Sequence, residues 1–102
     1  MNFKLVKKTY MDEDYEASFT WKDVPLKAIV RMHYHTFLHW WGSSYYIQYG
    51  RNNVTPIIKG EQYLNRKKAR ELAKQYMKDA SPSDVDKLDM FYQKEILSSV
   101  VK

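Results

Sequence analysis

Basic residues gather on one stretch of the chain at a spacing suited to binding phosphates. Four of them recur at i, i+3, i+7 and i+11, so on a helix they share one stripe, which a fifth residue widens. The set comprises Arg66, Lys67, Arg70, Lys74 and Lys78. Lysine suits phosphate binding because its charge reaches a phosphate without demanding one geometry. Four neutralised phosphates would give a slope of log affinity against log salt of about −3 to −4. The alternative is a solvated helix face, which is what a basic stripe opposite an apolar one usually is.

Aromatic residues form a second candidate surface. Twelve of the sixteen lie in residues 1–51. The candidates for contact are Trp40, Trp41, Tyr45, Tyr46 and Tyr49. Exposed rings on a sheet can stack on unpaired bases or anchor a protein partner. The alternative is that they fill the core, which must hold for about half of them because a small sheet needs large side chains.

Histidines and acids are the residues of this chain that could bind a metal or catalyse a reaction. His33 and His35 share a face of a predicted strand, but His39 would lie roughly 13 Å from His35, too far to share one ion. In a helix, His35 and His39 would instead be an i, i+4 pair, with no acid close in sequence to complete a site. The acids of residues 12–16 could hold magnesium in a nuclease, although a solvated turn explains them better. We therefore expect no metal, no cofactor and no catalytic residue; a metal-dependent nuclease is the least favoured alternative.

A sheet over residues 1–60 would position the aromatic set. The predicted strands cover residues 2–10, 15–22, 26–41, 45–49 and 54–59, with turns at 11–14, 23–25, 42–44 and 52–53. Residues 26–41 alternate apolar and polar side chains over sixteen positions, which favours a strand. They also carry a helical stripe, with Asp23 as a possible cap, so a helix stays open. Pro56 marks the last strand as an edge.

Two helices are predicted after the sheet. The first spans residues 64–79 and carries the basic stripe, with Asn65 as N-cap. The second spans residues 82–101, with Ser81 as cap, Pro82 in the first turn and Asp84 completing a capping box. Its apolar surface is broad enough to suggest deep packing or a homodimer through this helix.

Composition narrows the class of protein. The 102 residues carry a net charge of +5, and seven basic residues face only three acidic ones within residues 52–80. The sequence contains no cysteine, which excludes disulfides and thiolate chemistry in this chain. No apolar stretch approaches the length of a membrane span. Abundant Lys and Tyr with few Ala indicate an AT-rich bacterial genome, or a phage or mobile element within one.

The segment from about residue 28 to 78 resembles the three-strand-plus-helix, arm-type DNA-binding domain of tyrosine recombinases. The resemblance rests on Tyr-Tyr-Ile-Gln-Tyr-Gly-Arg at 45–51 and Tyr-Leu-Asn-Arg-Lys-Lys-Ala at 63–69. In that family the sheet reads DNA, which implies that Arg51, Asn52, Asn53 and Lys59 lie near the nucleic acid. The family's strongly basic hairpin and its catalytic domain are missing here.

The sequence therefore predicts one α+β domain, with an N-terminal antiparallel sheet of four or five strands covered by two C-terminal helices. The expected function is non-enzymatic, cytoplasmic binding of nucleic acid or a nucleoprotein. The alternative is an inhibitor or adaptor from a phage or mobile element that binds a host defence protein, of the anti-CRISPR or anti-restriction type.

Overall fold

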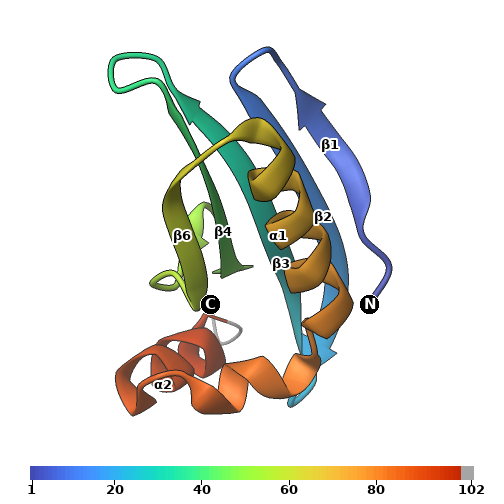
Figure 1. The fold of residues 1–102 in the computed structure, drawn as a ribbon. Coiled ribbons are helices and arrows are strands. Elements are labelled where there is room, and N and C mark those ends of the chain that lie inside the picture. Colours follow the sequence, from blue (N-terminus) through green and yellow to red (C-terminus); the bar gives the residue numbers. More distant parts are fainter. Residues whose placement is uncertain (100–102) are drawn as a thin grey trace.

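A six-stranded antiparallel sheet forms the N-terminal part of the computed structural model, which describes residues 1–99 (Figure 1). The strands are β1 (Lys4–Lys8), β2 (Asp12–Trp21), β3 (Val24–His35), β4 (Trp40–Tyr49), β5 (Asn53–Val54) and β6 (Lys59–Leu64). They follow the order β1-β2-β3-β4-β5, and β6 also pairs with β4. The predicted α+β class is confirmed, with one strand more than expected because residues 54–59 divide at Pro56 between two short strands.

Helix α1 (Arg66–Asp79) packs across one face of the sheet, against β3 and β4 (Figure 1). Asn65 is its N-cap, as predicted, because its side chain accepts a hydrogen bond from the backbone N–H of Lys68. Ala69 and Ala73 are buried against the sheet, and these small side chains let the helix approach closely. The face of the sheet opposite α1 is called the open face here, since no helix within residues 1–99 packs against it.

The C-terminal part contains two short helices where one long helix was predicted. A 3₁₀ helix, η1 (Pro82–Lys87), comes first and is followed by α2 (Met90–Ser98) at one end of the sheet. The Ser81 capping box is present as predicted. The prediction of one continuous helix over residues 82–101 is therefore wrong. The last two residues of that range lie outside the described part of the chain. None of the helices within residues 1–99 is long and apolar enough to cross a bilayer.

Two predicted turns are strand in the structure, and a third, predicted at 23–25, is strand from Val24 onward. Residues 42–44 belong to β4, and residues 12–14 open β2. At 42–44, small side chains are needed because α1 and β6 crowd this part of β4: a Cβ on Gly42 would lie 3.3 Å from a backbone oxygen of β6. Ser43 also donates a hydrogen bond of 2.6 Å to the carbonyl of Ala69 in α1.

The segment 26–41 is extended, as favoured, but it is not one strand. A turn at residues 36–39 divides it into the end of β3 and the start of β4, and His39 adopts a positive φ of 55° there. The turn before β3 is formed by Lys22 and Asp23, both with positive φ, as two-residue hairpins require. Pro25 lies within β3, beyond the register that β3 shares with β4.

Candidate nucleic-acid interface

The predicted basic stripe lies on α1 and is called the basic ridge. Two of its members are already paired with a buried acid. Arg70 donates to Glu13 Oε2 at 2.8 Å, and Arg66 lies 3.7 Å from the same oxygen. The Glu13 side chain is only 4% exposed, so most of its charge is directed at these two guanidinium groups. Arg66 and Arg70 therefore contribute less positive charge to the surface than their number suggests.

The other three members of the basic ridge, Lys67, Lys74 and Lys78, are exposed and make no ion pair with any of residues 1–99. They are spread over eleven helical positions, roughly 16 Å along the axis. This length can follow several consecutive phosphates of one strand. Their ammonium groups are free to bind an anion.

Two basic residues implicated by the family resemblance lie outside α1. Arg51 follows β4 at the end opposite Trp41, whose ring lies 5.7 Å from the Arg66 guanidinium. The length of β4 separates these ends by roughly 25 Å. Lys59 is exposed at the start of β6. The structure therefore does not bring Arg51 together with the N-terminal end of the basic ridge.

Tyr45 and Tyr49 do not belong to a contact surface, which corrects the expectation for both. Tyr45 is 1% exposed and donates to Asp84 at 2.8 Å. Tyr49 is 6% exposed and donates to Glu95 at 2.8 Å. Burial, together with the hydrogen bond to Glu95, raises the pKa of the Tyr49 phenol to about 12. Both hydroxyls anchor the C-terminal segments to β4.

The remaining three aromatic candidates divide between the two faces of the sheet. Trp41 lies on the α1 side, where it packs against Tyr34 with 5.2 Å between ring centroids. Trp40 and the half-buried Tyr46 lie on the open face. Trp40 is stacked on His35 at 5.0 Å and contacts Tyr63 at 5.1 Å. The basic ridge and the open-face rings are therefore separate surfaces.

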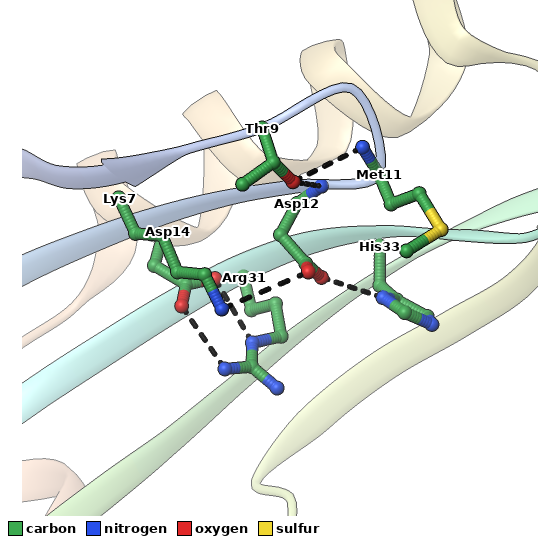
Figure 2. A network of polar contacts seen from close by, with 7 residues as sticks. All are labelled: Lys7, Thr9, Met11, Asp12, Asp14, Arg31 and His33. Carbon is green, nitrogen blue, oxygen red and sulfur yellow. Dashed lines mark hydrogen bonds and ion pairs between the residues drawn. The ribbon is translucent and has the colours of Figure 1, made fainter.

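A network of ion pairs covers the open face along β1, β2 and β3 (Figure 2). Arg31 makes a two-pronged contact with Asp14 at 2.9 and 3.0 Å. His33 Nδ1 lies 2.6 Å from Asp12, and Lys7 lies 3.9 Å from the same carboxylate. The acids predicted as a solvated turn thus neutralise the bases of the neighbouring strands.

The Asp12 carboxyl is held in its charged form by this network. Burial on its own raises the pKa of Asp12. The hydrogen bond to His33 and the nearby positive charges outweigh burial, and the net pKa is lower than the ordinary 3.8. Asp12 is therefore an anion at neutral pH and an acceptor for His33.

The three histidines do not converge. His33 faces Asp12, His35 accepts a hydrogen bond from the backbone of Leu38, and His39 lies 3.0 Å from the Tyr34 hydroxyl. Among residues 1–99, no three side chains of metal-binding type come together.

Sequence reasoning missed a groove on the open face between β3, β4 and β6. Its volume is about 770 Å³, within the range of small-molecule sites. The lining includes Arg31, His33, Trp40, Ser44, Gly60 and Tyr63. Period-two alternation had placed Arg31 and His33 on one strand face. Tyr63, however, lies in the part of β6 beyond residue 59, which was not predicted as a strand, and next to an irregularity that alternation does not reveal.

Exposed apolar side chains at the β3–β4 hairpin and on α2 are further candidates for contact with a partner. Phe37 is 85% exposed and Leu38 53% exposed at the tip of the β3–β4 hairpin. Phe91 is 59% exposed on α2, the helix expected to form a homodimer. The homodimer stays a prediction.

No family model, curated protein or solved structure matches this chain. The resemblance to the arm-type domain of tyrosine recombinases therefore stays a prediction, as do the functions it implies.

Proposed function

We propose that this protein binds nucleic acid without a chemical step and that the basic ridge of α1 follows the phosphates. The observation that carries the proposal is the exposure of Lys67, Lys74 and Lys78 along one helix, without an ion pair to any residue of 1–99. When unpaired lysines bind phosphates, the cations condensed on the nucleic acid are released. This release is the main source of sequence-independent affinity.

The number of free lysines sets the expected salt dependence. Three contacts to a single strand give a slope of log affinity against log salt of about −2. A fourfold rise in salt should then weaken binding by about 16-fold. This slope is shallower than the sequence alone suggests, because Arg66 and Arg70 are already paired with Glu13.

The test replaces Lys67, Lys74 and Lys78 together by Gln and measures binding of a labelled oligonucleotide by fluorescence anisotropy at several salt concentrations. A matched control replaces Lys4, Lys22 and Lys94 by Gln, which removes the same charge outside the basic ridge and away from the groove. We expect the ridge variant to lose most of its affinity and its salt slope, while the control keeps the slope. Equal losses in the two variants would contradict the proposal.

The exposed hairpin tip favours a second candidate function, which is binding to a protein as an adaptor or inhibitor. Phe37 and Leu38 offer an apolar contact that nothing within residues 1–99 covers. Exposed aromatic residues of this kind serve as anchors in protein interfaces. Under this alternative, replacing Phe37 by Ser would abolish partner binding, while the basic-ridge variant would retain it.

A further inference from the structure

The groove on the open face exists because small residues lie between large ones. Gly42 and Ser44 of β4 and Gly60 of β6 form its floor. A Cβ on Gly60 would lie 3.0 Å from the side chain of Ile57, and one on Gly42 would lie 3.1 Å from the ring of Trp40. Any larger side chain at either glycine would press against the groove wall, so the hollow depends on this pattern.

Tyr63 forms one wall in an unusual way. Between the pairs Trp41–Leu64 and Ser43–Glu61, two residues of β6 face a single residue of β4, which is the definition of a β-bulge. Tyr63 is in this bulge with a φ of +64°, a conformation that L-residues with bulky side chains rarely adopt. Glycine would fit this backbone without strain. The presence of a tyrosine in this strained conformation therefore indicates that its ring has a functional role.

The ring of Tyr63 is available to a ligand. Its side chain is 75% exposed, and one part of the ring contacts Trp40 at 5.1 Å with the planes inclined by 51°. Trp40 is in turn stacked on His35. The three rings support one another, so that Tyr63 offers a supported aromatic surface at the mouth of the groove.

The basic side chains that line the groove already face acids. Arg31 uses Nε and one terminal nitrogen for Asp14, and His33 uses Nδ1 for Asp12. The other terminal nitrogen of Arg31 and Nε2 of His33 have no partner among residues 1–99 and can hydrogen-bond to a ligand. Glu61, which also borders the groove, adds a negative charge. The groove therefore offers hydrogen bonds and a ring surface, without the net positive charge that a phosphate would require.

A flat, uncharged, hydrogen-bonding ring is the ligand that these features fit. The basic ridge begins at Arg66, three residues after Tyr63, so one strand can reach both surfaces around the junction of β6 and α1. A base paired in a duplex is stacked inside the helix and cannot enter the groove.

We infer that the groove on the open face holds an unpaired base of a single-stranded nucleic acid, stacked on Tyr63, while the basic ridge holds the phosphates of the same strand. This inference rests on the proposed function, because the strand must first be bound. It adds a preference for single strands over duplexes.

The test compares three probes of equal length: a single-stranded oligonucleotide, the same strand with abasic sites, and the blunt duplex. The abasic strand keeps the phosphates and lacks the bases. For the wild-type chain we expect the normal strand to bind about 5- to 150-fold more tightly than the abasic one, the range for stacking one base. Tyr63→Gly, which suits the backbone of the bulge, should reduce this ratio to about one, and Tyr63→Phe should retain it.

The outcomes separate the two proposals. If the wild-type chain binds the normal and abasic strands equally, the inference about the groove is overturned while the proposed function stands. If none of the probes binds, the proposed function itself fails. A second measurement, which needs no variant, follows the indole N–H signals of the three tryptophans by NMR. A shift of the Trp40 signal with the normal strand, but not with the abasic strand, supports the groove, and its absence contradicts it.

Discussion

Glu13 sets the charge of the basic ridge from beneath it, and Glu13→Gln tests this role. The Glu13 carboxylate lies under α1, 2.8 Å from Arg70, 3.7 Å from Arg66 and 3.0 Å from the Tyr15 hydroxyl that donates to it. Glutamine has nearly the same shape and keeps an acceptor for Arg70, but it removes the negative charge. The substitution therefore leaves two guanidinium groups without a counter-ion.

Opposite effects on stability and binding are expected. A hydrogen bond to a charged group contributes about 1 kcal/mol more than a neutral one. The free energy of unfolding should therefore fall by about 1 kcal/mol, and Tm by about 4–8 °C for a chain of this size. Binding should strengthen instead, because the basic ridge then presents one more net positive charge to the nucleic acid. The salt slope for a single strand should steepen from about −2 to about −3.

The assay measures the salt slope by anisotropy and the stability by urea unfolding. The matched control is Asp23→Asn in the exposed turn before β3, which changes the net charge equally, lies away from α1 and makes no ion pair within residues 1–99. We expect little change in stability and a smaller change in slope for this control. An unchanged or shallower slope in Glu13→Gln would refute the view that Glu13 restrains the basic ridge.

Two further predictions concern the anchors of the helices. Asn65→Ala removes the N-cap of α1 and should lower the free energy of unfolding by about 1 kcal/mol, measured by urea denaturation; no change would mean that the cap contributes nothing. The folded chain raises the pKa of Tyr49 from 10 to about 12, so this contribution to stability is complete below pH 10 and is lost as pH rises from 10 to 12. The free energy of unfolding of Tyr49→Phe should therefore fall less steeply with pH in that window than that of Tyr10→Phe, which changes an exposed tyrosine. Equal slopes for the two variants would contradict the prediction.

Local rules predicted the elements whose signals are themselves local. Asn65 and Ser81 cap helical segments as expected, because a side chain bonding to a nearby N–H depends on a few neighbouring residues. The alternation of residues 26–41 correctly indicated extended chain. The turn at 36–39 was missed because it contains no glycine or proline, and His39 supplies the positive φ instead.

Features that depend on distant contacts were not predicted. Gly42 and Ser43 are residue types that favour turns, but they lie in β4. Small side chains are needed there because β6 and α1 approach this strand closely. Asp12 and Asp14 have the composition of a turn, yet the bases of β3 pair with them across the sheet. Glu13 pairs with Arg66 and Arg70, which lie more than fifty positions away in the sequence. Local patterns do not reveal such a pair, so the free charge predicted for the basic ridge was too high.

The most direct measurement of the central claim is the map of backbone amide shifts by NMR while a single-stranded oligonucleotide is added. The account predicts that the shifts gather on the outer side of α1 from Lys67 to Lys78 and around Gly42, Gly60 and Tyr63. Shifts confined to the hairpin tip at Phe37 and Leu38 or to α2, or no shifts at all, would contradict it.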